Sequence, residues 1–210
     1  MLKAKTFIIV SMAFILIGLL ILFTYDKIEI HLSINSVNSS FLDFFFKYWT
    51  YLGDGIVAPV IVLILGLISY QKNGWSTFIW GFSTLITAGF LAQILKRTVF
   101  PDALRPIGII DPEKLHLVNG VDLHTFHSFP SGHTAAGFAF MAFIAGFFFA
   151  KNKIAQIIIA LAAVLIGYSR MYLSQHFLED VVTGAVLGIL SYVIAFTIKS
   201  FIEKKALPKT

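Results

Sequence analysis

The sequence predicts an all-α polytopic membrane protein with six transmembrane helices and an interfacial amphipathic helix after the first. Hydrophobic residues make up 58% of the chain and charged residues only 13%, against about 25% charged in typical soluble domains. The strict alternation of β-barrel strands is absent. Six apolar runs lack charge at their centres and approach the roughly 17 to 25 residues that a spanning helix needs. They cover residues 6–24, 55–71, 75–95, 133–150, 154–172 and 181–199.

The first run has two interpretations, because Lys3 and Lys5 precede it as they would in a signal peptide. The run is longer than a typical signal-peptide core, and no small-x-small cleavage pattern follows Phe23. We therefore expect a retained helix over 6–24, with a cleaved signal peptide as the alternative. The sequence has no internal repeat, so we expect one domain over 1–210.

The connections between the runs alternate between short and long. The turns near Lys72 and Lys151 span a few residues and predict tight antiparallel helical hairpins. Two long connections, 25–54 and 96–132, fall on the opposite side, and long loops often carry function. Within the first, the aromatic segment 41–52 predicts a helix lying in the membrane interface. It either anchors the bundle or guides lipid toward a site.

The distribution of basic residues predicts the orientation. With the N-terminus inside, nine of the 16 Lys and Arg residues lie on the inner side, and four of the other seven belong to the candidate site below. This positive-inside bias predicts a multi-pass protein of the cytoplasmic membrane with both termini cytoplasmic. The net charge of +5 suits anionic lipid at the inner surface, so no nucleic-acid partner is expected.

Helix order brings three polar segments to the outer, periplasmic face. The runs 75–95 and 154–172 end on that side, while 133–150 and 181–199 begin there. The segments 96–106, 130–133 and 169–180 therefore share one face. So many polar groups at one end of apolar helices predict a functional site.

His176 and Asp180 are four residues apart where the last helix begins, so their side chains can share a face. A carboxylate that accepts a hydrogen bond from one ring nitrogen fixes the tautomer and makes the other nitrogen a better nucleophile. The pair predicts a nucleophile and its orienting group. The alternative is a structural ion pair at a helix terminus.

The motif Pro130-Ser131-Gly132-His133 precedes the fourth apolar run. Ser131 can cap the helix, Gly132 leaves the amides open to a ligand, and a helix N-terminus favours phosphate. His133 beside such an anion can act as a general acid. The alternative is an ordinary cap with a solvated histidine.

Basic side chains near this helix start predict a pocket for a dianion. Arg105 lies in a proline-bounded loop, and Arg170 closes the fifth run with a planar fork that suits paired phosphate oxygens. Lys96 and Arg97 end the third run, where basic residues also snorkel for structural reasons. Either one can supply the third cation.

Other polar residues receive structural interpretations. The chain has no cysteine, and the histidines at 124, 127 and 133 lack acidic partners at helical spacing, so we expect no metal and no cofactor. We expect His31 and His116 to be loop residues. The small-xxx-small pair Gly184 and Gly188 predicts close packing inside the bundle, with dimerisation as the alternative. No oligomer is required.

Together the three motifs resemble those of the type 2 phosphatidic acid phosphatase superfamily, membrane lipid phosphatases that share their pocket with vanadium haloperoxidases. Residues 130–133 match the Pro-Ser-Gly-His signature, and Ser169, Arg170, His176 and Asp180 match Ser-Arg-x5-His-x3-Asp. The first signature departs from the family, because eight residues separate Lys96 from Arg105 where six are usual. That departure leaves open whether Lys96 or Arg97 fills the first position.

The resemblance implies roles for these residues. His176 would attack phosphorus to form a phosphohistidine, Asp180 would orient it, and His133 would protonate the leaving oxygen. Lys96, Arg105, Ser131, Gly132 and Arg170 would bind phosphate, without a metal. The substrate would be a lipid phosphomonoester or pyrophosphate, of the isoprenyl pyrophosphate, phosphatidylglycerophosphate, phosphatidic acid or lipid A type. The alternative is a non-catalytic lipid-phosphate binding or transport protein.

Overall fold

The computed structural model describes residues 3–206 and shows an all-α protein, with no strand in that range. Three short 3-10 helices, η1 (Thr50–Gly53), η3 (Pro106–Gly108) and η4 (Pro112–Lys114), and a π-helical turn, η2 (Leu95–Val99), lie among eight α-helices. The α-helices are α1 (Lys5–Thr24), α2 (Lys27–Ser36), α3 (Ser40–Trp49), α4 (Val57–Asn73), α5 (Ser76–Ile94), α6 (Gly132–Phe148), α7 (Lys153–Tyr172) and α8 (Leu178–Ala206).

Four helices in the described range are individually long and apolar enough to cross a membrane: α1, α5 with its η2 extension, α7 and α8. A fifth candidate is the pair formed by α3 with η1 and by α4, which bend by 58° relative to each other. α6 is apolar but has only 17 residues. The structure therefore supports a multi-pass membrane protein, and the count of six spans stays a prediction.

Each of the six apolar runs forms a helix, with two differences from the predicted layout. The last helix begins at Leu178 and continues to Ala206, beyond the predicted 181–199. The first long connection contains two helices, because a separate α2 precedes the predicted aromatic one. Asp26 begins α2 by accepting a hydrogen bond from the Ile28 amide at 2.8 Å, and Ser39 caps α3. The short turns after α4 and α6 form the expected hairpins.

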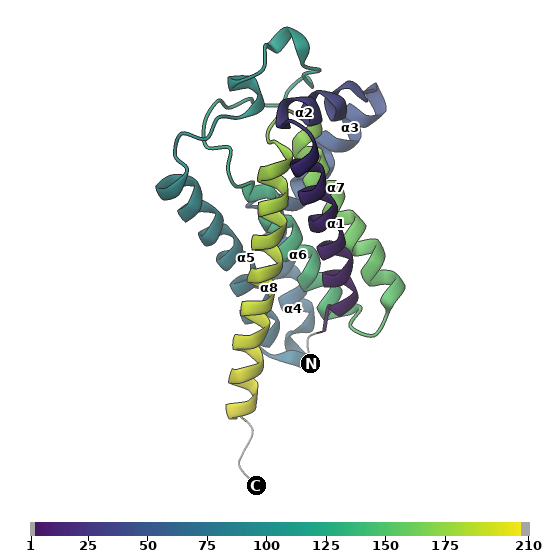
Figure 1. Ribbon diagram of the computed structural model, residues 1–210. Coiled ribbons are helices and arrows are strands. Elements are labelled where there is room, and N and C mark those ends of the chain that lie inside the picture. Colours follow the sequence, from purple (N-terminus) through teal and green to yellow (C-terminus); the bar gives the residue numbers. More distant parts are fainter. Residues whose placement is uncertain (1–2, 207–210) are drawn as a thin grey trace.

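α6 is the central helix of the bundle (Figure 1), and most of its side chains are buried. Gly184 and Gly188 of α8 face it directly. A Cβ atom on Gly184 would lie 2.7 Å from the Ser131 carbonyl oxygen, and one on Gly188 would lie 2.6 Å from that of Ala135. The pair therefore permits close packing of α8 against the start of α6, in agreement with the packing interpretation.

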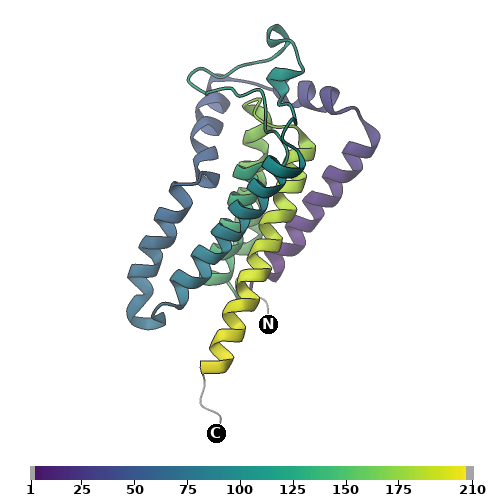
Figure 2. The same cartoon turned by 90° about the vertical axis from the view of Figure 1, so that its left-hand side faces the viewer.

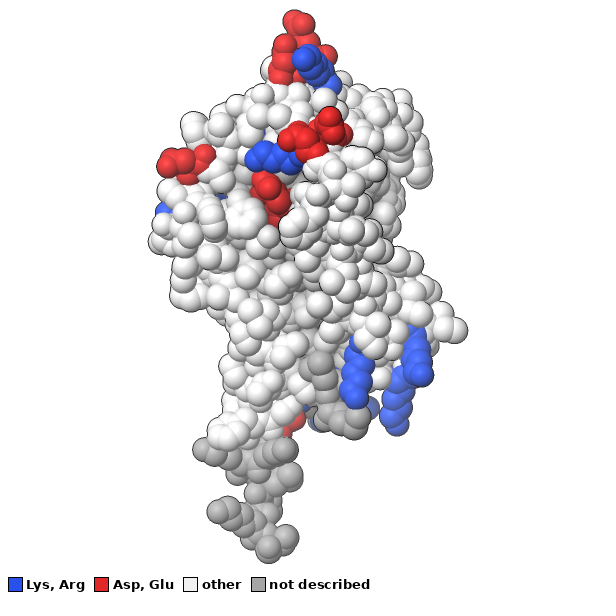
Figure 3. Space-filling model, in the orientation of Figure 1, with Lys and Arg blue, Asp and Glu red and all other residues white. Residues whose placement is uncertain are grey.

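The outer surface of the bundle suits lipid. On α1, the buried residues Phe7, Ser11, Ile15 and Gly18 form one stripe, while large apolar side chains such as Leu20 on the other face are exposed. Figure 3 shows a broad band without charged side chains between one end that carries acidic and some basic groups and another end where basic groups predominate.

The two ends of the bundle carry different parts of the chain. The long connections, with α2 and α3, lie at one end, and both ends of the described chain lie at the other (Figures 1 and 2). The α6 and α8 N-termini and the α7 C-terminus meet beneath the long loop between η2 and α6. This arrangement brings the three polar segments together at one end of the bundle.

Candidate active site

A cavity of about 610 Å³ opens at the end of the bundle that carries the long connections. Its size is typical of a pocket for a small ligand. Six of the eight predicted site residues line it: Lys96, Arg105, Gly132, His133, Arg170 and His176. The other two, Ser131 and Asp180, are buried and lie behind this surface.

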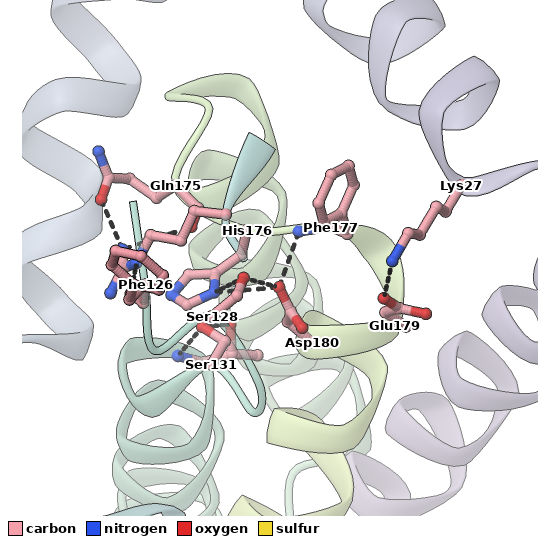
Figure 4. Close-up of polar contacts among 11 residues, drawn as sticks. Lys27, Phe126, Ser128, Ser131, Gln175, His176, Phe177, Glu179 and Asp180 are labelled. Carbon is pink, nitrogen blue, oxygen red and sulfur yellow. Dashed lines mark hydrogen bonds and ion pairs between the residues drawn. The ribbon is translucent and has the colours of Figure 1, made fainter. Parts of the chain in front are cut away.

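His176 is held in position through a single ring nitrogen. Its Nδ1 lies 3.2 Å from Asp180 Oδ2 and 3.4 Å from Ser128 Oγ, and both residues are almost completely buried. A proton donated from Nδ1 to the carboxylate leaves the lone pair on Nε2 for the cavity. Figure 4 shows the imidazole, Ser128 and Asp180 as one connected group. Burial, together with the positive charges of nearby Arg and Lys side chains, lowers the pKa of His176 well below its usual value. The imidazole is therefore neutral, as a nucleophile must be.

Ser128 belongs to this group but was not among the residues predicted from the sequence. Its Oγ donates a hydrogen bond to Asp180 Oδ2, which also accepts one from the Phe177 amide at 2.9 Å. The only sequence signal was its place two residues before the Pro130 motif. A lone serine in a loop carries no periodicity or charge that would single it out.

Ser131 caps α6, as predicted. Its Oγ accepts hydrogen bonds from the Thr134 amide at 3.3 Å and the Thr134 hydroxyl at 2.8 Å. The side chain is fully buried, so its proposed contact with phosphate would require a rearrangement of the cap. Gly132 lines the cavity, and a Cβ atom there would meet open space. The amides at the start of α6 are therefore accessible to an anion.

The structure distinguishes the two candidates for the first cation. Lys96 lies in the π-helical turn that extends α5, is 9% exposed and lines the cavity. Arg97 is exposed, and its Nε donates to Gln93 Oε1 at 3.2 Å on the preceding turn. Only Lys96 faces the candidate site. The wider π-helical turn followed by the turn at Pro101 takes up the long spacing to Arg105.

Two guanidinium groups complete the positive side of the cavity. Arg105 is anchored by hydrogen bonds from Nη1 to Gln175 Oε1 at 2.8 Å and from Nε to the Phe126 carbonyl oxygen at 3.0 Å. Burial lowers the pKa of Arg105, and the Asp180 carboxylate opposes this effect. Arg170 donates from Nη1 to Thr50 Oγ1 at 2.8 Å, but its buried Nε has no partner in the described chain. An unpaired buried donor on a cation is costly and suits an anionic ligand.

His133 has a partner that the sequence did not reveal. Its Nε2 lies 3.7 Å from Asp54 Oδ2, and both residues line the cavity. Asp54 follows η1, where Gly53 allows the chain to pass close to α6: a Cβ atom there would lie 2.4 Å from the His133 carbonyl oxygen. Burial and the nearby cations disfavour a charged imidazole at this position, and the Asp54 carboxylate is an opposite charge that acts against them.

Backbone hydrogen bonds join the polar segments. The Ser131 amide donates to the Asp180 carbonyl oxygen at 3.0 Å, and the Ser128 amide donates to that of Ala103 at 2.9 Å. Within the segment 169–180, the His176 amide donates to the Arg170 carbonyl oxygen at 3.1 Å and fixes the turn before α8. Each segment is thereby fixed against another one, so the side chains reach the cavity from rigid backbone.

His31 is a buried residue of α2, which corrects its predicted place in a loop; His116 does lie in the loop after η4. His31 Nε2 lies 3.2 Å from Ser174 Oγ, and its ring packs edge-on against Phe177. Burial lowers the pKa of His31 to about 4. Asn35, one turn later on α2, donates to the Ser174 hydroxyl and accepts from the His116 amide. α2 thus supports the turn that carries His176.

No group of three or more His, Cys, Asp or Glu side chains within residues 3–206 could hold a metal ion. The candidate site is instead a cavity with three cations, a helix N-terminus, and two histidines that each face a carboxylate.

Comparison with known proteins agrees with this geometry. Residues 77–203 match the family described as the PAP2 superfamily, and the chain belongs to that superfamily. It is 34% identical over 167 residues to phosphatidylglycerophosphatase B of Bacillus subtilis, covering 74% of this chain and 72% of that protein. It is also 28% identical over 164 residues to the lipid A 4'-phosphatase of Bacteroides thetaiotaomicron, covering 76% and 71%.

Two solved structures share the fold. The transmembrane PAP2-type phosphatidylglycerolphosphate phosphatase of Bacillus subtilis superposes with a TM-score of 0.68 at 26% identity, covering 97% of this chain and 98% of that one. Aquifex aeolicus LpxE gives a TM-score of 0.63 at 29% identity, covering 81% and 94%. The protein is therefore a membrane-embedded member of a family that includes lipid phosphatases.

Proposed function

We propose that this protein hydrolyses a phosphomonoester or pyrophosphate group of a membrane lipid through a phosphohistidine intermediate, without a metal. The observation that carries the proposal is the contact between His176 Nδ1 and Asp180 Oδ2 at the wall of a cavity lined by three cations. Family membership and lipid phosphatases among the relatives support the same reaction class.

The first step would be attack of His176 Nε2 on phosphorus, which forms an N–P bond as the bond to the lipid oxygen breaks. Asp180 holds the ring and stabilises the positive charge that develops on it. Lys96, Arg105 and Arg170, with the Gly132 amide, would stabilise the equatorial phosphate oxygens, the main electrostatic contribution to the rate.

His133 would protonate the departing lipid oxygen. Burial and the nearby cations disfavour a charged His133 in the empty cavity, so the negative charge of the bound phosphate, together with Asp54 at 3.7 Å from His133 Nε2, would supply the protonated form that a general acid requires. In the second step His133 would take a proton from water, which attacks phosphorus and releases phosphate from His176. The same imidazole thus acts first as acid and then as base.

The substrate panel follows from the relatives. The first lipid to assay is phosphatidylglycerophosphate and the second is a lipid A type phosphate, because the relatives described above are named for these substrates. Phosphatidic acid and isoprenyl pyrophosphate complete the set. We propose that all would reach the cavity from the outer leaflet, with both termini cytoplasmic; a C-terminal reporter that proved periplasmic would overturn this orientation.

The deciding experiment measures phosphate release from this panel in detergent with wild type and His176→Ala. Wild type should turn over at least one lipid, and the variant should lose release while still binding that lipid, because the cations remain. Full turnover by His176→Ala would exclude the mechanism. Binding without turnover by wild type across the whole panel would favour the alternative, a lipid-phosphate binding or transport protein.

A further inference from the structure

A second cavity has a volume of about 400 Å³. The elements that line it meet at the end of the bundle opposite the long connections, as the ribbon in Figure 1 shows. It is formed where the N-terminal segment, the turn between α4 and α5, and the last part of α8 meet. Three lysines line it, Lys3, Lys72 and Lys199, together with Ser76 and Trp80. None of these residues takes part in the proposed reaction.

The lysines carry more positive charge than the cavity balances. Lys199 pairs with Glu203 at 2.7 Å, and Glu203 also accepts from Ser76 at 2.9 Å. Lys3 and Lys72 form no ion pair within the part of the chain that the structure describes. One carboxylate thus faces three ammonium groups, and the cavity favours an anion.

Trp80 gives an independent indication of a ligand. Its ring is 1% exposed and lies under two of the cations, with Lys3 Nζ at 5.8 Å and Lys199 Nζ at 5.4 Å from the ring centroid. Its buried Nε1 has no hydrogen-bond partner among the described residues. An indole N–H can only donate, so the wall of the cavity contains a donor without an acceptor beneath two cations.

The surroundings indicate that the anion belongs to a lipid. A groove of about 170 Å³ shares Ser76, Lys199 and Glu203 with the cavity and adds Ile79 and Ile202. These isoleucines are 46% and 48% exposed on helices that face the membrane. The basic cavity therefore continues into an apolar groove on the outside of the bundle. A lipid fits this arrangement, because its charged head group is joined to an apolar acyl chain.

We propose that this cavity binds the phosphate head group of an anionic membrane lipid in the leaflet opposite the candidate active site. Lys3, Lys72 and Lys199 contact the phosphate, and an acyl chain lies along Ile79 and Ile202. Basic pockets between transmembrane helices recognise anionic head groups in this way. The proposal does not depend on the proposed catalytic function.

The test uses the purified full-length protein in detergent, titrated with phosphatidylglycerol, phosphatidylcholine or inorganic phosphate while the unfolding temperature is recorded. Phosphatidylglycerol should stabilise wild type, and its apparent affinity should fall about tenfold in Lys3→Gln/Lys72→Gln. The matched control is Lys151→Gln/Lys153→Gln, which removes one lysine from the turn after α6 and one from the first position of α7, both outside the cavity. The control should bind as wild type does.

Equal responses of the two double variants would show general surface electrostatics and overturn the proposal. An equal shift with phosphatidylcholine or with inorganic phosphate would overturn the assignment to an anionic lipid. Lys3 and Lys72 form no ion pair in the described chain, so without lipid the double variant should lose only the stability that the contact of Lys3 with the Trp80 ring contributes. Lys72→Gln alone, in the exposed last turn of α4, provides a milder variant for the same comparison if the double variant does not fold.

Discussion

Ser128 donates a hydrogen bond to the Asp180 oxygen, Oδ2, that also lies 3.2 Å from His176 Nδ1. The Phe177 amide donates to this oxygen as well, at 2.9 Å. Three groups therefore converge on one carboxylate oxygen, and the two that are not the imidazole fix its position. The orientation of the proposed nucleophile depends on a loop residue far from it in sequence.

Replacement of Ser128 by alanine should lower kcat with little change in KM, because it loosens the orienting carboxylate without touching a phosphate ligand. A hydrogen bond to a charged group contributes about 1.5 to 3 kcal/mol, which corresponds to a decrease of roughly 10-fold to 100-fold. Steady-state phosphate release measures both constants. Asp180→Asn is the reference for complete loss of the carboxylate, and a Ser128→Ala enzyme with unchanged kcat would exclude this positioning role.

Lys96 and Arg97 provide a matched pair of variants. Lys96→Gln should reduce kcat/KM by about 10²-fold, because it removes a charge that faces the developing charge on phosphate. Arg97→Gln should stay within about twofold, since the Arg97 side chain is exposed and bonds only to Gln93 in the described chain. Equal losses in the two variants would contradict the assignment of the first cation to Lys96.

The apolar runs predicted the six long helices because lipid permits apolar side chains on every face of a spanning helix. α2 was not predicted, since Lys27–Ser36 has no apolar run and begins with a cap at Asp26. His31 was placed in a loop for the same reason. In a segment without hydrophobic periodicity, burial arises from tertiary contacts such as those with Ser174 and Phe177.

In the candidate site, too, residues in recognisable motifs could be predicted from the sequence and isolated polar residues could not. Residues in dense motifs, such as His176 and Asp180, could be identified because a spacing of four residues at the start of a helix brings two side chains together, although His176 itself precedes α8. Ser128 and Asp54 could not, because each is a single polar residue in a connection and meets its partner only after folding. The sequence favoured Lys96 as the first cation with Arg97 as the alternative, and in the π-helical turn Lys96 is the one that lines the cavity.

Asp54→Asn should reduce hydrolysis of lipid substrates by about 10-fold or more, because it weakens the protonated state of His133 that general acid catalysis requires. A substrate with a good leaving group, such as p-nitrophenyl phosphate, needs no such proton, so its rate of hydrolysis should decrease much less. The comparison of the two substrates measures the effect. Asp122→Asn removes another carboxylate of the cavity wall and serves as the control. Equal losses on both substrates would exclude a role for Asp54 in protonating the leaving group.

Chelation should leave the activity unchanged. Cations and a helix N-terminus supply the positive charge of the cavity, and no metal-binding group of side chains exists within residues 3–206. Phosphate release is measured after dialysis against EDTA, beside a metal-dependent phosphatase that loses its activity. Activity that disappears with EDTA and returns with a divalent ion would contradict metal-independent hydrolysis.

The stability of the fold should decrease as the pH falls from about 6.5 toward about 4, in part because of His31. Its pKa is lowered from 6.5 to about 4 by burial, partly opposed by the Asp180 carboxylate. In this range His31 is protonated in the unfolded chain and neutral in the folded one. The unfolded state then binds more protons, so acid favours unfolding.

His31→Gln retains a hydrogen-bonding partner for Ser174 and removes this titration. The unfolding temperature of the variant should therefore depend less on pH between about 7 and about 4.5 than that of wild type. Some dependence should remain, because the pKa of His176 is lowered in the same direction. His124→Gln, a change at an exposed loop histidine, should retain the wild-type slope. A His31→Gln slope equal to that of wild type would show that His31 does not couple folding to protons.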